Sequence, residues 1–324
     1  MTHELLQAAD ALQPHTVALR RQLHRRPELG LHTPHTRAAV LAALDGLPLD
    51  ITLHETTSGI AALLTGARPG PTVLLRGDMD ALPLLEDTGE SCTSQIDGAM
   101  HACGHDGHTA MLAGAARLLA DRRSELAGRV LFMFQPGEEN GSRGALHMLD
   151  EGLLDVPAHA VDGSASPVAA AYAVHLTPNA PTGVVVSKAG PLMASSDRIT
   201  ITVTGRGGHA SDPSRALDPI PVACEIVQAL QTMVTRSIDV FDPGIVTIGR
   251  IAAGTTNNVI PETAVIEGTM RAVSPATRQR LHDGVRRVAE GVASAHGVGV
   301  EVNLALGYGA VSYTHLTLPT NREV

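Results

Sequence analysis

Tryptophan is absent from this chain, and aromatic residues make up only 2% of its 324 positions. A hydrophobic core must therefore be built mainly from Ala, Val, Leu and Ile, and hydrophobic residues, at 44%, are numerous enough for one. Cysteine is also scarce. Three cysteines, an odd and small number, are not typical of a disulfide framework. Their scarcity favours a reducing compartment.

Signals for membranes and nucleic acids are missing as well. No apolar run approaches the ~20 residues that a membrane-spanning helix requires. The N-terminal residues MTHELLQAAD lack the basic and apolar regions of a signal peptide. The net charge of −9 argues against nucleic acid or an anionic membrane surface as a partner. We therefore expect a cytoplasmic protein with about two domains.

The first half of the chain shows alternating patterns for helices and strands. Apolar residues spaced three and four apart predict helices, and short apolar runs bounded by Gly and Pro predict buried strands. This alternation is typical of an α/β fold with a mixed, mostly parallel sheet and flanking helices. The expected helices span 2–26, 36–44, 107–120 and 144–151, and the expected strands span 60–64, 71–76, 129–135 and 169–174.

From about residue 188 the pattern changes. Residues 197–205 (DRITITVTG) alternate between apolar and polar side chains, which predicts a half-exposed strand. The order of the expected elements is β-α-β-β-α-β, that of a ferredoxin-like α+β module, and we expect 188–306 to form a separate domain after 1–187. The remaining expected elements are a helix at 218–237, strands at 245–252 and 264–273, a helix at 275–296 and a strand at 298–306.

Residues 100–108 (MHACGHDGH) contain three histidines, one cysteine and one aspartate. Cys103 and His105 lie two apart across a glycine, so both can point into one pocket, and thiolate and imidazole are ligands of zinc-type metals. Ligand sites of parallel sheets lie beyond the carboxyl ends of the strands. Three expected strands lead directly to polar side chains at such ends: Asp78 and Asp80, Glu138 and Glu139, and His175. The sequence therefore predicts a metal centre at the edge of the sheet where the carboxyl ends of these strands meet.

Structural interpretations of the same residues stay open at this point. The 100–108 stretch could be a His-rich surface loop, and Cys103 could be a small buried hydrophobe. The Glu138–Glu139 pair could be a solvated acidic turn. His209 could be an ordinary turn residue, and Arg271 could form a surface salt bridge, although a guanidinium also suits a substrate carboxylate.

Seven motifs follow one another along the chain: LHRRPEL (23–29), RGDMDALP (76–83), MHACGHDGH (100–108), FQPGEE (134–139), GGHAS (207–211), NNVIP (257–261) and GTMR (268–271). In this order they resemble the M20 metallopeptidase family. Within it they are similar to the amidohydrolase branch of hippurate hydrolases, N-acyl-amino-acid amidohydrolases (aminoacylases) and auxin-conjugate hydrolases. The resemblance implies a zinc-exopeptidase-like catalytic domain with an inserted lid domain that pairs subunits into homodimers.

The resemblance also assigns roles to individual residues. It implies that Glu138 is the general base and that Asp80 orients a neighbouring imidazole, while Asp78 replaces a histidine found in other branches. The implied metal ligands are Cys103, His105, Glu139 and His175, and the implied catalytic and substrate-contacting residues of the lid are His209, Asn258 and Arg271. One or two Zn, Mn or Co ions are the implied cofactor.

The C-terminal end departs from the family pattern. A further histidine ligand, expected in a segment that returns to the catalytic domain, is not found. Residues 307–324 resemble the start of that return, and 312–324 resemble a vector-derived end. The chain therefore resembles a truncated member of the family.

The residue types suit hydrolysis of an amide bond. A zinc-type ion lowers the pKa of water toward ~7 and polarises a carbonyl, while Glu138 can pass a proton from water to the leaving amine. We expect a metal-dependent amidohydrolase that cleaves N-acyl amino acids, such as hippurate-like or N-acetyl substrates, to a carboxylate and a free amino acid. The alternatives are a metallo-dipeptidase or carboxypeptidase of the same family and a catalytically inactive, truncated metal-binding protein.

Overall fold

The structure is a computed structural model that describes residues 2–158, 162–310 and 312–313. It divides into two compact units, Met1–Thr182 and Gly183–Val324, and each is described by itself. The sequence pattern predicts this boundary at residue 187. Within the described residues, no helix is long and apolar enough to cross a membrane.

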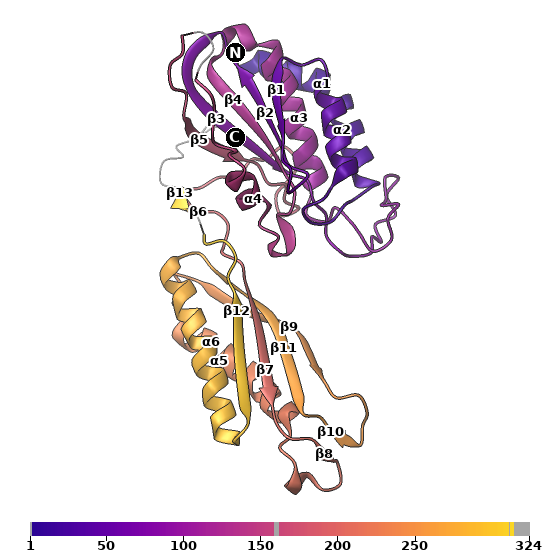
Figure 1. Cartoon of the computed structure of the whole chain (residues 1–324), viewed down its shortest axis with the longest axis vertical. Helices are drawn as coiled ribbons and strands as arrows, with labels where there is room; N and C mark the ends of the chain where they lie inside the picture. Colours follow the sequence, from indigo (N-terminus) through magenta and orange to yellow (C-terminus); the bar gives the residue numbers. More distant parts are fainter. Residues whose placement is uncertain (1, 159–161, 311, 314–324) are drawn as a thin grey trace. The chain divides into compact units, whose positions relative to one another are not determined.

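The first unit is built around a five-stranded sheet with the strand order β1-β2-β4-β3-β5 (Figure 1). β4 is parallel to β3, which is parallel to β5, whereas β2 is antiparallel to both β4 and β1. Four of the five strands therefore share one direction, which confirms the mixed, mostly parallel sheet. The strands are β1 (Leu49–Leu53), β2 (Ile60–Thr65), β3 (Arg68–Asp78), β4 (Ala127–Gln135) and β5 (Val168–Ala173).

Helices cover both faces of this sheet. On one face α2 (Pro34–Leu44) and α3 (His105–Asp121) share a core with Phe132 and Phe134, and α1 (Thr2–His24) packs beside α3. On the other face α4 (Gly144–Asp150) places the buried Met148 against Leu131 and Met133 of β4. Alternate residues of β4 thus point to opposite faces, and both faces are buried, which explains why its sequence is almost continuously apolar.

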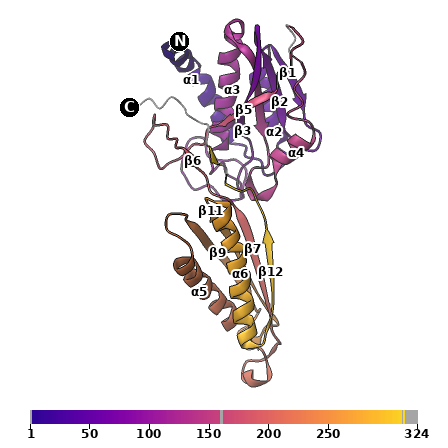
Figure 2. The same ribbon diagram turned by 90° about the vertical axis from the view of Figure 1, so that its left-hand side faces the viewer.

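The second unit is a four-stranded antiparallel sheet with the order β12-β7-β11-β9, and α5 and α6 pack on one face (Figure 2). Along the chain the order is β-α-β-β-α-β, as the sequence predicts. The main elements are β7 (Asp197–Thr204), α5 (Pro219–Ser237), β9 (Gly244–Ala253), β11 (Thr263–Ala272), α6 (Pro275–His296) and β12 (Gly299–Ala305). Two short pairs join β6 (Gly190–Pro191) to β13 (Ser312–Tyr313) and β8 (Gly208–His209) to β10 (Val259–Ile260).

A buried carboxylate ties the elements of the second unit together. Asp197 accepts hydrogen bonds from Nε and Nη2 of Arg278 at 2.8 and 2.6 Å, from His282 Nε2 at 2.9 Å and from the backbone N–H of Gly307 at 2.9 Å. Burial alone would raise the pKa of Asp197, but these bonds and the charge of Arg278 outweigh it and lower the pKa to about 2.

We predict that Asp197→Asn destabilises the protein at neutral pH but not in acid. A carboxyl whose pKa is depressed in the folded state contributes stability above its unfolded pKa of 3.8, and loses it as the pH falls toward 2. The two proteins should differ by about 2 kcal/mol at pH 6 and by little near pH 2, as measured by urea unfolding. A difference that stays constant over this range would show that the charge of Asp197 is not what stabilises the fold.

Candidate metal centre

The predicted site residues of the first unit meet at one edge of the sheet. Asp78 ends β3, Glu138 and Glu139 follow β4, and His175 lies two residues beyond β5, so all come from the carboxyl ends of parallel strands. His105 is the first residue of α3. Gly104 before it has φ +82°, a left-handed conformation that glycine adopts without strain, and this turn places Cys103 beside the helix start.

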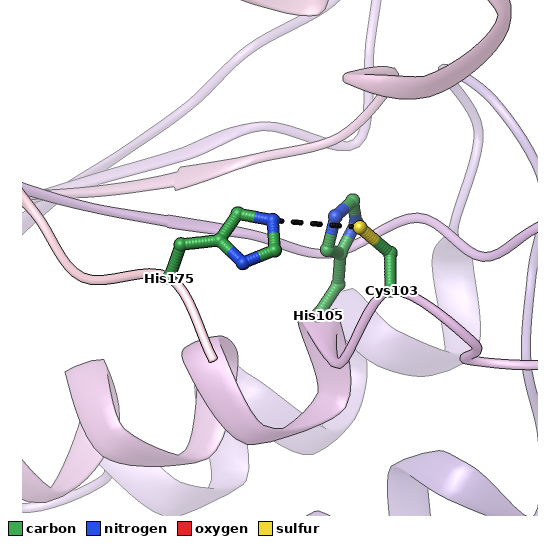
Figure 3. Close-up of side chains that lie close together, drawn as sticks. All are labelled: Cys103, His105 and His175. Atoms are coloured by element: carbon green, nitrogen blue, oxygen red, sulfur yellow. Dashed lines mark hydrogen bonds between the residues drawn. The ribbon is translucent and has the colours of Figure 1, made fainter. Parts of the chain in front are cut away.

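Cys103, His105 and His175 point toward one another (Figure 3). One ligand atom from each lies within 4.8 Å of the others, and Cys103 Sγ is 3.5 Å from His175 Nε2. Nδ1 of His105 donates to the backbone oxygen of Asp80 at 2.8 Å, and Nδ1 of His175 donates to that of Leu176 at 2.6 Å. Both rings therefore direct Nε2 into the cluster, as metal-binding histidines do.

The chemistry of this cluster fits a divalent metal. Nε2 of His105 is buried and has no hydrogen-bond partner among the described residues, a costly state for a polar atom unless a ligand engages it. Thiolate, imidazole and carboxylate together are the donor set of zinc-type ions. The structure thus brings together the predicted ligands Cys103, His105 and His175, and it places Glu139 beside His105 in a second group with Glu138.

The pKa shifts show that the cluster favours a positive charge. The neighbouring imidazoles of His105 and His175 lower the pKa of the Cys103 thiol. Burial would lower the pKa of His105, but the neighbouring side chains of Asp80, Cys103 and Asp78 raise it to about 11. The hydrogen bond with Cys103 is the main cause that raises the pKa of His175 to about 8. Groups that stabilise a proton here stabilise a metal cation in the same way.

Asp80 holds the two glutamates in place. Its carboxylate oxygens accept hydrogen bonds from the backbone N–H groups of Glu138 and Glu139, each at 2.9 Å. Glu138 Oε2 and Glu139 Oε1 each lie 4.0 Å from His105 Nε2. The carboxylate of Asp80 lies 3.6 Å from His105 Nδ1, so its backbone oxygen, rather than its side chain, makes the close contact that orients this imidazole.

The two glutamates differ in exposure. The Glu138 side chain is 42% exposed and that of Glu139 is 20% exposed. Partial burial and the neighbouring charge of Glu139 raise the pKa of Glu138. The more exposed glutamate thus has a carboxyl with increased proton affinity, a property suited to accepting and returning a proton.

Two residues to which the sequence pattern assigns no ligand or catalytic role, Asp78 and His108, are part of the centre. The Asp78 carboxylate contacts Arg76 Nη1 at 2.7 Å and His108 Nδ1 at 2.6 Å, and lies 3.4 Å from His105 Nε2. Burial would raise the pKa of Asp78, but the hydrogen bond with His108 and the charge of Arg76 lower it well below its usual range. The position of Asp78 at a strand end is a usable signal, whereas His108 carries little by itself.

The other predicted site residues lie in the second unit. His209 in β8 pairs with Val259, and the backbone oxygen of Asn258 accepts from Ala210 N at 3.1 Å, so His209 and Asn258 are neighbours. Ser211 N donates to His209 Nδ1 at 3.2 Å. Arg271 is exposed on β11. The structure thus brings His209 and Asn258 together near the start of β11, whereas Arg271 lies at the other end of that strand. All three belong to the second unit, and the candidate metal ligands belong to the first.

Comparison with known proteins decides the family. Residues 74–316 match the family described as peptidase family M20/M25/M40. The chain belongs to this family. Its matched region includes every candidate site residue named above, from Asp78 to Arg271.

The curated relatives include proteins named as a deacetylase, an amidohydrolase and a carboxypeptidase. An N-acetylcysteine deacetylase from Bacillus subtilis (strain 168) is 40% identical over 91% of this chain and 74% of its own length. An N-acyl-L-amino acid amidohydrolase from Geobacillus stearothermophilus is 33% identical over 94% of this chain and 80% of its own. Thermostable carboxypeptidase 1 from Saccharolobus solfataricus is 35% identical over 88% of this chain and 70% of its own length.

Solved structures agree with this assignment. A putative aminohydrolase from methicillin-resistant Staphylococcus aureus superposes with a TM-score of 0.83 at 32% identity, over 96% of this chain and 80% of that chain. A Bacillus subtilis M20 protein described as a dinuclear metal-binding peptidase superposes with a TM-score of 0.73 at 36% identity, over 94% of this chain and 76% of that chain. Together with the cluster of Cys103, His105 and His175, M20 membership identifies a divalent metal as the cofactor of this chain.

We predict that Cys103→Ser weakens metal binding by about 100-fold or more, because even groups that only support a ligand are worth about 10–100-fold. The matched control is Cys224→Ser, which changes an exposed cysteine of the second unit. Metal content after dialysis against a chelator of known affinity measures the effect. Equal metal content in the two variants would exclude Cys103 as a ligand.

Proposed function

We propose that this chain hydrolyses the amide bond of N-acyl amino acids and releases a carboxylate and a free amino acid. The observation that carries the proposal is the cluster of thiolate, imidazoles and paired glutamates at the strand ends of an M20 chain. Relatives named N-acetylcysteine deacetylase and N-acyl-L-amino acid amidohydrolase, at 40% and 33% identity, support this substrate class.

The residues of the first unit have separate roles in metal binding and proton transfer. Cys103, His105, Glu139 and His175 would hold the metal, which we propose to be zinc, manganese or cobalt. When bound, the ion acts as a Lewis acid toward the amide carbonyl and makes water more acidic. Glu138 takes a proton from the attacking water and returns it to the leaving amine, and its raised pKa increases its affinity for that proton. The carboxylate of Asp80 fixes the positions of Glu138 and Glu139 by accepting hydrogen bonds from their backbone amides.

Residues of the second unit would bind the substrate. The hydrogen bond from Ser211 N to His209 Nδ1 places the ring hydrogen of His209 on Nε2, which can then donate to a substrate oxygen. Asn258, beside His209, offers a second polar contact. Arg271 is exposed, and its planar guanidinium suits the carboxylate of an amino acid product.

We also propose roles for the two parts of the chain. Residues 1–187 would be the catalytic domain, and 188–306 would be a lid that also pairs two copies into a homodimer in the cytoplasm. The proposed return of 307–324 to the catalytic domain falls partly on residues 311 and 314–324, which lie outside the described residues.

A carboxypeptidase is the second candidate, because a relative at 35% identity is named thermostable carboxypeptidase 1. Comparing turnover of acetyl- and benzoyl-amino acids with turnover of dipeptides and longer peptides separates the two activities. Faster peptide turnover would favour the carboxypeptidase. A chain that binds metal but turns over none of these substrates would instead be an inactive metal-binding protein.

We predict that Glu138→Gln lowers kcat by about 10²–10⁴-fold and leaves metal affinity nearly unchanged, because a glutamine cannot exchange the proton. The matched variant Glu139→Gln should instead lower metal affinity. Turnover of an N-acetyl amino acid and metal content are measured on the same preparations. Near-normal kcat in Glu138→Gln would remove its role as general base.

We further predict that Arg271→Ala raises KM about 10–100-fold for N-acyl amino acids and has little effect on the corresponding C-terminal amides, since a charge-assisted hydrogen bond contributes about 1.5–3 kcal/mol. Arg250→Ala is the control, because Arg250 is also exposed and is paired with Glu267 on the neighbouring strand. The same KM increase for acids and amides would contradict carboxylate binding by Arg271.

A further inference from the structure

The buried ring of His108 uses both of its nitrogens in hydrogen bonds. Leu176 N donates to Nε2 at 2.8 Å, and since an amide nitrogen only donates, Nε2 carries no hydrogen. The ring hydrogen is therefore on Nδ1, which donates to Asp78 Oδ1 at 2.6 Å. With both nitrogens engaged, His108 has no free lone pair for a metal, although it lies close enough to Asp78 and His105 to form a candidate ligand group.

The two partners of His108 belong to different parts of the metal centre. Asp78 ends β3 and faces His105 Nε2 at 3.4 Å. Leu176 follows His175 directly, and its backbone oxygen accepts from His175 Nδ1 at 2.6 Å. The rings of His108 and His175 are 4.8 Å apart between centroids. His108 thus connects the end of β3 to the segment that carries His175.

That segment depends on α3 for its position. Among the strands that the structure describes, β5 lies at the edge of the sheet and pairs only with β3, and His175 beyond it is exposed. Leu176 packs on the first turn of α3, where a Cβ at Gly107 would lie only 2.5 Å from Leu176 Cδ1. A hydrogen bond to a buried ring and a contact that glycine permits therefore fix the backbone next to His175.

We propose that His108 is a positioning residue for metal binding. It holds the backbone of Leu176, and thereby sets the distance between the imidazole of His175 and the Cys103–His105 pair. This inference rests on the proposed set of metal ligands. Loss of a partner that orients a metal ligand weakens metal binding by about 10–100-fold, and we expect this loss for His108→Ala.

Co²⁺ binding to the full chain tests the proposal, because thiolate-to-cobalt absorption reports Cys103 and titration gives the affinity. His108→Gln should recover most of the affinity that His108→Ala loses, since the amide oxygen of glutamine can reach the position of Nε2 and accept from Leu176 N. His54→Ala is the control, because His54 is equally buried in the same unit but contacts Glu151 instead. Wild-type affinity in His108→Ala would overturn the proposal.

A double-mutant cycle separates positioning from a general structural role. If His108 acts through His175, His108→Ala should cost less than about threefold in a His175→Ala background, because the two changes then remove the same interaction. An equal loss of affinity in both backgrounds would overturn the proposal.

A third comparison remains decisive even where His108→Ala does not fold, as judged by the thermal unfolding of the metal-free protein. Asparagine can replace the Nδ1 donor toward Asp78 but does not reach Leu176. Tight binding by His108→Gln with weak binding by His108→Asn supports the proposal, and the reverse order overturns it. A wild-type chain without thiolate-to-cobalt absorption would overturn the ligand set and this inference together, whereas absence of hydrolysis alone would affect only the proposed function.

Discussion

A buried imidazole is the constraint on which the metal centre depends. His105 is only 1% exposed, and all three groups of candidate ligands in the described residues include it. Burial of a ring with two polar nitrogens is unfavourable unless both are engaged. The backbone oxygen of Asp80 engages Nδ1, and thiol, imidazole and carboxylate groups surround Nε2. The strand ends, the left-handed turn at Gly104 and the start of α3 all serve to bring these groups to one atom.

The surrounding groups form two levels of support. Cys103, His175 and the glutamates face His105 Nε2, and behind them Asp80 holds the glutamates while Asp78 contacts His105 and Arg76. Each supporting contact uses a backbone amide, a backbone oxygen or a buried charge. Such contacts have little rotational freedom, so the donor atoms are held near their binding geometry before a metal arrives.

Much of the fold could be predicted from the sequence, because burial leaves a pattern. β4 is buried on both faces and reads as a continuous apolar run, and β7 alternates because only one face is buried. β1 is absent from the expected strands because four of its five residues are exposed, so burial leaves no apolar pattern there. The position of ligand sites at the carboxyl ends of parallel strands was enough to predict that Cys103, His105 and His175 meet at one edge of the sheet.

Other parts of the site could not be read from the sequence. One of the two partners of His108 is the backbone amide of Leu176, which is 68 residues away, and a backbone group gives no residue-type signal. The carboxylate of Asp80 likewise binds backbone amides, so its contact with Glu138 and Glu139 is visible only in three dimensions. The residue types indicate which chemistry is present, whereas the hydrogen bonds between distant segments depend on how the chain folds.

The network around Asp197 has a consequence for how the second unit is connected. Asp197 begins β7 and binds the backbone of Gly307, and Ser196 N donates to the backbone oxygen of Tyr308 at 3.3 Å. Further out, β6 pairs with β13, so the two ends of this unit run side by side. A unit whose ends are neighbours can be inserted into a loop of another domain without stretching it. The second unit is therefore modular, and one buried carboxylate holds its two chain ends together.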